Sequence, residues 1–255
     1  MEEKLLNTNK TYGLVGFPLG HSFSKSFFNE KFLKEGINAE YINFEIENVE
    51  KFRDIIQSKL ICGLNVTIPH KSSIIKFLDE TDEVAKEIGA VNVVKFIRNN
   101  GKLILKGYNT DVMGFTNSIS KMINSNHKKA LILGTGGVSK AIDYSLRRIG
   151  IETKFVSRNK KPNILTYDML NIDIMKEYTI IVNASPVGMY PNINCAPQIP
   201  YEYLSKNHIV FDTIYNPSET LFMKLASANG ATVKNGLEML EDQAIAAWNI
   251  WNDKQ

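Results

Sequence analysis

Residues 129–149 contain the feature that most constrains the fold, an apolar run that leads through glycines into a helical stretch. Residues 130–133 are entirely apolar, Gly134, Gly136 and Gly137 surround Thr135, and a helix is expected from there to about residue 149. A short apolar strand, a tight glycine turn and a helix form the first part of a βα unit, whose next strand lies parallel to the first. The chain is therefore expected to contain a parallel sheet covered by helices.

The same alternation of β-branched runs and longer amphipathic stretches occurs along the whole chain, so we predict an α/β fold. The chain has 255 residues, which at about 150 residues per domain leaves room for one large or two modest domains. The predicted strands lie at residues 12–16, 40–46, 63–66, 91–97, 103–106, 130–133, 154–157, 179–183 and 209–213, and the predicted helices of the first half at 24–35, 49–58 and 74–78.

Two such series, separated near Tyr108, predict two domains. The pair Asn100-Gly101 is typical of a two-residue hairpin turn, which would join the strands on either side of it. Residues 238–251 form a helix so rich in Ala, Ile and Trp that it must dock on another surface. We expect residues 1–107 to form the first domain, residues 108–236 the second, and residues 237–255 to return to the first.

Composition excludes several classes of protein. Hydrophobic residues make up 44% and charged residues 22%, and the net charge of +3 is too small to indicate nucleic-acid or membrane-surface binding. No apolar run approaches the roughly 18 residues of a membrane helix, so we predict a cytoplasmic protein. The two cysteines, Cys62 and Cys195, are far apart and outside any zinc-ligand spacing, so neither a disulfide framework nor a metal site is expected.

The glycine turn after residue 133 predicts dinucleotide binding. Gly134 permits the tight turn, and Gly136, which lacks a Cβ, lets a pyrophosphate approach the N–H groups at the start of the helix. The strict fingerprint is incomplete, because Ser139 stands where a third glycine is usual. The alternative is an ordinary strand-to-helix turn.

The end of the next strand favours NADP over NAD. An Asp or Glu there would accept from the ribose hydroxyls of NAD, but the chain reads Ser157-Arg158-Asn159 followed by two lysines. Arg158 offers a planar fork that can pair with a phosphate and stack on adenine. The alternative is a solvated basic turn.

Polar residues in the first half form a second constellation. Asn65 and Thr67 share one face of a strand end, and Pro69 fixes a turn that brings Lys71 beside them. Several of the polar residues in this half also have an ordinary structural explanation. Ser22, Ser24 and Asp111 could be helix N-caps, Asn92 a satisfied buried amide, and Lys71 and His70 surface groups.

In combination, these segments resemble the shikimate dehydrogenase family, over nearly the whole chain. The segments that carry the resemblance are Gly16 to Ser24, Asn65 to Lys71, Gly89 to Asn92, Gly107 to Gly114, the glycine turn, Asn183 to Met189, Asp212 to Pro217 and Gly236 to Gln243. The resemblance implies a substrate domain with an open sheet, a Rossmann-like NADP domain and a cleft between them. It implies NADPH-dependent reduction of 3-dehydroshikimate to shikimate in aromatic amino-acid biosynthesis.

The resemblance also implies roles for individual residues. Lys71 and Asp111 would form the catalytic pair, with Lys71 supplying the proton for the new hydroxyl and Asp111 orienting its ammonium. The implied substrate-binding residues are Ser22 and Ser24 for the carboxylate, with Tyr215 near it, and Asn65, Thr67, Asn92 and Gln243 for the ring hydroxyls. The implied cofactor-binding residues are Gly134, Thr135, Gly136, Gly137, Val138, Ser157, Arg158, Asn159 and, beside the nicotinamide, Gly236.

Two departures from the usual family pattern are present. Ser157 stands where an asparagine is more usual, and Thr135 is larger than the common residue between the first glycines. Two alternatives to the main interpretation also stay open: a quinate/shikimate dehydrogenase of broader specificity, and a non-catalytic dinucleotide-sensing module. We expect a monomer or homodimer with small-molecule ligands.

Overall fold

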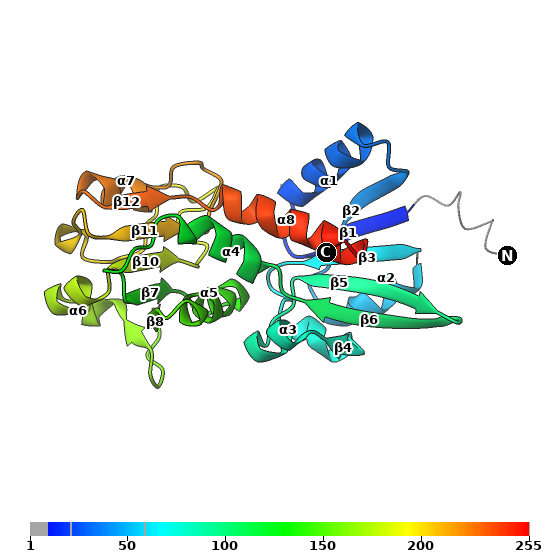
Figure 1. Ribbon diagram of the computed structural model, residues 1–255, viewed down its shortest axis with the longest axis horizontal. Helices are drawn as coiled ribbons and strands as arrows, with labels where there is room; N and C mark the ends of the chain where they lie inside the picture. Colours follow the sequence, from blue (N-terminus) through cyan, green and yellow to red (C-terminus); the bar gives the residue numbers. More distant parts are fainter. Residues whose placement is uncertain (1–9, 21, 59, 255) are drawn as a thin grey trace. The chain divides into compact units, whose positions relative to one another are not determined.

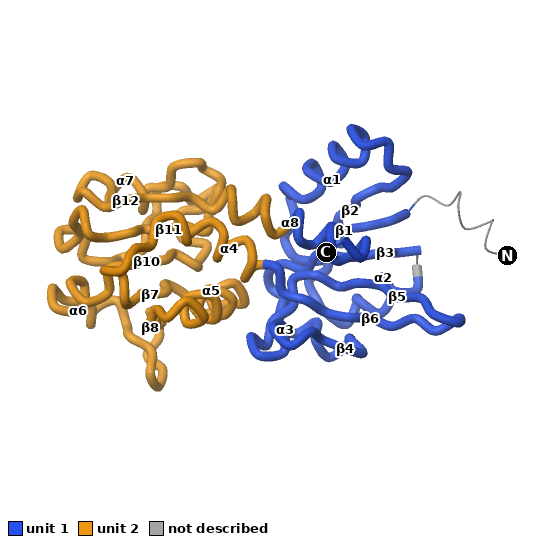
Figure 2. Tube along the Cα trace, in the orientation of Figure 1, with its two compact units in different colours: residues 1–110, 244–255 blue, residues 111–243 orange. Residues whose placement is uncertain are grey.

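The computed structural model describes residues 10–20, 22–58 and 60–254. The chain divides into two compact units (Figure 2), residues 1–110 with 244–255 and residues 111–243. The functional domains expected from the sequence, residues 1–107 with 237–255 and residues 108–236, remain a proposal.

Unit 1 is built on a six-stranded mixed sheet in the order β2-β1-β3-β5-β6-β4 (Figure 1). β1 lies parallel to β2 and β3, whereas β5 runs antiparallel to both β3 and β6. Its elements are β1 (Lys10–Gly16), α1 (Phe23–Lys34), β2 (Ala39–Glu45), the 3₁₀ helix η2 (Val49–Lys51), α2 (Phe52–Ser58), β3 (Ile61–Val66), the 3₁₀ helix η3 (Ser73–Phe77), β4 (Glu80–Thr81), α3 (Glu83–Ile88), β5 (Val93–Asn99) and β6 (Lys102–Tyr108).

The hairpin between β5 and β6 has the predicted two-residue turn. Asn100 and Gly101 have φ values of +49° and +78°, the left-handed conformations that such a turn requires. The strands pair from Asn99 with Lys102 down to Val93 with Tyr108. The hairpin therefore places Asn109 and Thr110, which follow β6, beside residues 90–92, which precede β5.

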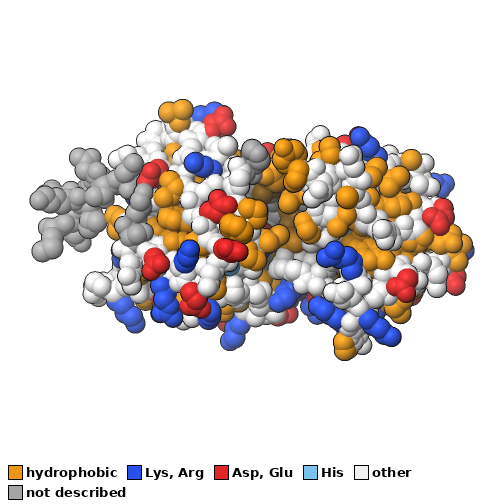
Figure 3. All heavy atoms as spheres, turned by 180° about the vertical axis from the view of Figure 1, so that it is seen from behind, with side chains coloured by type: hydrophobic (Ala, Val, Ile, Leu, Met, Phe, Trp, Pro, Cys, Tyr) orange, Lys and Arg blue, Asp and Glu red, His pale blue; other side chains and the backbone are white. Residues whose placement is uncertain are grey.

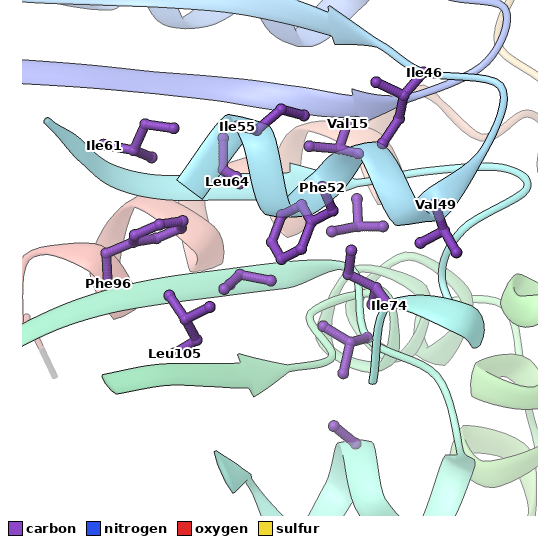
Figure 4. Packing of buried hydrophobic residues seen from close by; sticks show 14 residues of the cluster. Val15, Ile46, Val49, Phe52, Ile55, Ile61, Leu64, Ile74, Phe96 and Leu105 are labelled. Atoms are coloured by element: carbon purple, nitrogen blue, oxygen red, sulfur yellow. The ribbon is translucent and has the colours of Figure 1, made fainter. Parts of the chain in front are cut away.

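Both faces of the unit 1 sheet are covered. On one face, Phe52 of α2 lies among Val15, Ile55 and Leu64 (Figure 4). On the other, α1 and the last two turns of α8 (Leu237–Trp251) pack on β1, and Trp251 Nε1 donates to the carbonyl oxygen of Val94 at 3.2 Å. The apolar end of α8 thus belongs to the core of unit 1.

Unit 2 is built on a six-stranded parallel sheet in the order β12-β11-β10-β7-β8-β9. Its remaining elements are α4 (Asp111–Ser120), β7 (Lys129–Leu133), α5 (Gly137–Arg148), β8 (Glu152–Ser157), β9 (Leu165–Thr166), the 3₁₀ helix η4 (Tyr167–Met169), α6 (Ile172–Glu177), β10 (Ile180–Asn183), the 3₁₀ helix η5 (Tyr201–Tyr203), β11 (Ile209–Asp212), α7 (Leu221–Ala228) and β12 (Thr232–Lys234).

The strand order of unit 2 is that of a Rossmann fold. The chain starts at β7, adds β8 and β9 on one side, and then crosses over to add β10, β11 and β12 on the other. Helices α4 and α5 cover one face through Phe115, Ile142 and Leu146, and α6 and α7 cover the other through Met175 and Phe222. In such sheets ligands bind outside the carboxyl ends of the strands at the reversal point, here between β7 and β10.

The predicted α/β class is confirmed, with differences in detail. Residues 74–78, expected as a helix, form the 3₁₀ helix η3, and the strand expected from Val91 begins at Val93. Val91 N–H donates to the carbonyl oxygen of Lys71 at 2.7 Å, outside the strand ladder. The short helices α3, α6 and α7 and the strands β4, β9 and β12 were not predicted, because they are too short for a clear apolar period.

Candidate active site

The carboxyl end of β3 carries the first predicted site residues of unit 1. Asn65 is buried; its Oδ1 accepts from the Tyr41 hydroxyl at 2.7 Å, and its Nδ2 donates to the carbonyl oxygen of Asn92 at 3.4 Å. Thr67, just beyond the strand, donates its N–H to the carbonyl oxygen of Val15 at 2.9 Å. An amide with partners at both ends keeps one orientation and still has hydrogen-bonding capacity for a ligand.

Ser22 and Ser24 lie at the start of α1. Ser22 is the N-cap, and its Oγ accepts from Lys25 N–H at 3.2 Å, so the structural role expected for it is present. Ser24 is buried and its hydroxyl is hydrogen-bonded to the phenol of Tyr41. Burial raises the pKa of Tyr41 well above its usual value, and the Ser24 hydrogen bond opposes that rise only in part, so the phenol stays a donor.

Asn92 joins the two polar segments at the base of the hairpin. Its Nδ2 donates to Thr110 Oγ1 at 3.0 Å, and its Oδ1 accepts from Thr110 N–H at 2.7 Å. The neighbouring Asn109 donates from Nδ2 to the carbonyl oxygen of Ala90 at 2.9 Å. Asn92 is therefore a buried and hydrogen-bonded amide, and the backbone that leads into Asp111 is fixed by side chains.

Lys71 follows β3 on a loop whose main chain is held from both sides. The preceding residue, His70, is buried, and its Nε2 lies 2.7 Å from the carbonyl oxygen of Ile46. The carbonyl oxygen of Lys71 accepts from Val91 N–H at 2.7 Å. The backbone that carries the half-buried Lys71 side chain is therefore fixed, and the hydrogen bond of His70 helps to hold the loop in place.

Asp111 and Gln243 belong to neighbouring helices of unit 2. Asp111 is buried at the first position of α4, and Gly114 follows one turn later. A Cβ at Gly114 would lie 2.4 Å from the carbonyl oxygen of Met239 and 3.2 Å from Gln243 Cβ. Gln243 is buried, with Nε2 donating to the carbonyl oxygen of Leu240 at 3.0 Å. The close helix contact at Gly114 brings these two predicted site residues to one region of unit 2.

The predicted dinucleotide turn lies at the reversal point of the unit 2 sheet. Gly134 has a φ of +119°, and a Cβ there would lie 3.0 Å from the carbonyl oxygen of Ala184, so only glycine fits without strain. Gly136 is exposed, has no atom within 4 Å of an added Cβ, and donates its N–H to Ser139 Oγ at 3.2 Å. Thr135 is also exposed, and Gly137 and Val138 form the first turn of α5. This arrangement has the shape of an open phosphate cradle.

The end of β8 presents the predicted phosphate-reading residues. Ser157 ends the strand and accepts from Asn159 N–H at 3.3 Å through Oγ. Arg158 is exposed, and no ion pair engages it within residues 10–20, 22–58 and 60–254. Figure 3 shows basic side chains around the turn that projects after β8, where Lys160 and Lys161 are exposed as well. The turn therefore offers positive charge to an anion.

Tyr215 and Gly236 lie on adjacent segments of unit 2. Gly236 N–H donates to the carbonyl oxygen of Ile214 at 3.0 Å, and a Cβ at Gly236 would lie 2.2 Å from the carbonyl oxygen of Thr213. Tyr215, which directly follows Ile214 in the chain, is half-buried. The contact requires a residue without a side chain at position 236.

Three residues of these networks were missed by sequence reasoning: Tyr41, Thr110 and Asp212. Asp212 ends β11 and is completely buried. A carboxylate at the end of an otherwise apolar strand is a signal that could have singled out Asp212. Tyr41 and Thr110 carry no such signal, because their partners come from other segments of the chain. Within the described ranges, no group of three or more His, Cys, Asp or Glu side chains could hold a metal ion, and no helix is long and apolar enough to span a membrane.

Comparison with known proteins identifies the family. Residues 14–94 match the shikimate dehydrogenase substrate binding domain. The chain is 41% identical over 267 residues to the NADP(+) shikimate dehydrogenase of Methanococcus maripaludis strain C6, covering 96% of this chain and 92% of that protein. The chain belongs to the shikimate dehydrogenase family.

Solved structures agree with this membership. The shikimate dehydrogenase of Aquifex aeolicus superposes with a TM-score of 0.84 at 36% identity, covering 96% of this chain and 93% of that one. A shikimate dehydrogenase crystallised with NADP+ gives a TM-score of 0.81 at 35% identity, covering 96% and 90%. The resemblance inferred from the sequence motifs is therefore confirmed.

Proposed function

We propose that this chain is an oxidoreductase that uses NADPH to reduce 3-dehydroshikimate reversibly to shikimate, within aromatic amino-acid biosynthesis. The observation that carries this proposal is its similarity, over nearly the full length, to NADP-dependent shikimate dehydrogenases. The residue types at the strand ends of both units suit this chemistry.

Lys71 is the proposed acid. Reduction of a ring ketone needs a proton for the oxygen that becomes a hydroxyl, and a cationic lysine both supplies it and polarises the carbonyl. In the reverse direction the neutral amine accepts that proton. The support for this role is the fixed main chain around Lys71, which limits where its side chain can reach.

Asp111 is proposed to orient the Lys71 ammonium and to accept from a neighbouring substrate hydroxyl. It directly follows Thr110, whose N–H and hydroxyl are both bonded to Asn92. Thr110, which immediately precedes α4, is therefore held by hydrogen bonds within unit 1. A carboxylate in a fixed place can bind one substrate hydroxyl selectively.

The remaining side chains are proposed to bind the substrate. Ser22 still has its O–H to donate, because its cap bond uses Oγ as an acceptor. With Ser24 it suits a carboxylate, and Tyr215 is proposed to lie near the same group. The residues proposed for the ring hydroxyls are Asn65, Thr67, Asn92 and Gln243.

The cofactor would be held by unit 2, and NADPH supplies the hydride when bound. The open turn from Gly134 to Val138 would take the pyrophosphate, and the exposed guanidinium of Arg158, with Ser157 and Asn159, would take the 2′-phosphate. The tight segment at Gly236 would lie beside the carboxamide of the nicotinamide. Each of these positions is compatible with the group proposed for it.

We further propose a cytoplasmic protein that works as a monomer or homodimer. The near balance of basic and acidic residues supports a protein that does not depend on nucleic acid or a membrane surface.

The direct test follows NADPH oxidation by absorbance with 3-dehydroshikimate, with NADH and 3-dehydroquinate as parallel controls. We expect turnover with NADPH and 3-dehydroshikimate. Comparable turnover of 3-dehydroquinate would instead indicate a quinate/shikimate dehydrogenase. Cofactor binding without turnover of either substrate would indicate a dinucleotide-sensing module.

A further inference from the structure

Asp212 is a buried carboxylate that connects three segments at the carboxyl edge of the unit 2 sheet. Its Oδ1 accepts from Ile214 N–H at 3.0 Å and from Asn183 Nδ2 at 3.0 Å, and its Oδ2 accepts from the Thr220 hydroxyl at 2.7 Å. Thr220 is the N-cap of α7. One side chain thus ties the end of β10, the turn after β11 and the start of α7 to a single point.

Asn183 extends this connection into the loop after β10. Its Oδ1 accepts from the N–H and the hydroxyl of Ser185 at 3.1 and 2.7 Å, and its Nδ2 also donates to the carbonyl oxygen of Val187 at 3.2 Å. All the hydrogen-bonding capacity of the Asn183 side chain is used. The loop after β10 is therefore locked to Asp212 through Asn183.

Hydrogen bonds of the turn after β11 link Asp212 to Gly236. Asp212 accepts from the N–H of Ile214, and the carbonyl oxygen of Ile214 accepts from Gly236 N–H at 3.0 Å. The backbone of Thr213 lies against Gly236 too closely for any side chain. Tyr215 follows Ile214 in the same turn. Movement of Asp212 would therefore displace both Tyr215 and Gly236.

A purely structural connection does not require a charge here. The donors to Asp212 are neutral, and no ion pair engages it within residues 10–20, 22–58 and 60–254. Its relative exposure is 0%, and burial raises its pKa to about 6 despite these hydrogen bonds. Burying a carboxylate without a cation costs stability, so its presence points to a need for the three hydrogen bonds that fix these segments.

We propose that Asp212 is a positioning residue for the reaction, one that fixes Tyr215 and the backbone at Gly236 relative to the loop after β10. This inference rests on the proposed function, because it assigns Tyr215 to the substrate side and Gly236 to the nicotinamide. Asp212 itself touches neither ligand in this account. It acts through Ile214 and Asn183.

The test compares Asp212→Ala and Asp212→Asn with Met175→Ala, a cavity variant at a buried position of α6 in the core of the same unit. The readouts are kcat, the melting temperature, and the dissociation constants of NADPH and of 2′-phosphoadenosine 5′-diphosphate, which lacks the nicotinamide. An Asn oxygen can accept from both Ile214 and Asn183 while its NH₂ donates to Thr220. We therefore expect Asp212→Asn to recover most of what Asp212→Ala loses.

For Asp212→Ala we expect kcat to fall by about 10²-fold, the loss typical of a small misplacement of reacting groups. NADPH should bind about tenfold more weakly, while the adenosine fragment binds as in the parent chain. Met175→Ala should lower the melting temperature without changing kcat or the ratio of the two dissociation constants. If Asp212→Ala does not fold, Thr220→Val removes one of the three donors and should change the same ratio in the same direction.

Equal loss of fragment and NADPH affinity, or equal effects of Asp212→Ala and Met175→Ala on kcat, would overturn the proposal. A variant Asp212→Asn no better than Asp212→Ala would do so as well. If the parent chain does not turn over 3-dehydroshikimate, the proposed function fails, and the affinity ratio alone then decides whether Asp212 positions the nicotinamide side.

Discussion

The phenol of Tyr41 donates a 2.7 Å hydrogen bond to Oδ1 of Asn65, and both side chains are buried. The same phenol is bonded to Ser24. Tyr41 thus links two residues proposed to bind different parts of the substrate, from a strand that carries no proposed ligand of its own. Its role is to hold Asn65 and Ser24 in fixed orientations.

Tyr41→Phe should raise KM for 3-dehydroshikimate and leave KM for NADPH unchanged. The substitution leaves a buried acceptor of Asn65 without its donor, which costs about 1–3 kcal/mol of folding stability. Steady-state kinetics and thermal unfolding check both effects. Tyr12→Phe, at another buried tyrosine of unit 1, serves as the control for loss of a phenol. An unchanged substrate KM in Tyr41→Phe would contradict this role.

Arg158→Ala should weaken NADPH binding by about 10- to 10²-fold, because charge-assisted hydrogen bonds contribute about 1.5–3 kcal/mol. NADH lacks the 2′-phosphate, so its binding should change little. Fluorescence titration with both cofactors measures the two affinities. Arg148→Ala, an exposed arginine at the end of α5, controls for loss of positive charge on unit 2. Equal losses for NADPH and NADH would show that Arg158 does not read the 2′-phosphate.

Gly134→Ala and Gly136→Ala should separate folding from cofactor binding. At Gly134 a methyl group meets the carbonyl oxygen of Ala184 with φ at +119°, so stability should fall by about 1–3 kcal/mol. At Gly136 the methyl group meets nothing within 4 Å, so stability should be retained while NADPH affinity drops at least about tenfold. Denaturant unfolding and NADPH titration provide the measurements. Normal NADPH binding by Gly136→Ala would place the pyrophosphate elsewhere.

Local signals explain which parts of this fold could be predicted. The glycine turn and the Asn100-Gly101 hairpin depend on backbone conformations that few residues adopt, so sequence alone located them. The short helices α3, α6 and α7 begin with capping residues Asp82, Asn171 and Thr220. Those signals were present, but six to eight residues give too little apolar periodicity to distinguish a helix from a loop.

The site divides in the same way. Motif residues such as Lys71 and Arg158 were predicted, because each lies in a short segment whose residue sequence is recognisable. The networks that hold them were not. Tyr41 reaches Asn65 only through the pairing of three strands, and Asp212 reaches Thr220 only through the turn between β11 and α7. Such partners depend on register and burial, which a single sequence does not display.

The titration of Asp212 gives a pH dependence of stability with a defined sign. Its pKa is about 6 when folded, against 3.8 for an ordinary aspartate, so the folded chain keeps this proton more strongly. The stabilising contribution is complete below about pH 4 and is lost as the pH rises through about 6, a change of about 3 kcal/mol. The nearby Tyr201 stays neutral in this range, since burial raises its pKa.

The measurement is the free energy of unfolding of the parent chain minus that of Asp212→Asn, across pH 4 to 7. The difference should decrease as the pH rises and become constant above the titration. Subtraction removes the contributions of other groups such as Glu238, whose pKa is lowered to about 2 by hydrogen bonds from Lys121 and Lys234. A difference that is constant or increases with pH would contradict the buried titration.

The most direct test of the account is the turnover of 3-dehydroshikimate with NADPH by the parent chain, Lys71→Ala and Lys76→Ala. Lys76 is an exposed lysine one turn along the same segment, paired with Glu50. A positioned acid contributes about 10² to 10⁴ in rate, so Lys71→Ala should lose at least about 10²-fold in kcat. Its NADPH dissociation constant should change little, and Lys76→Ala should match the parent chain. Near-normal turnover by Lys71→Ala would contradict the proposed chemistry.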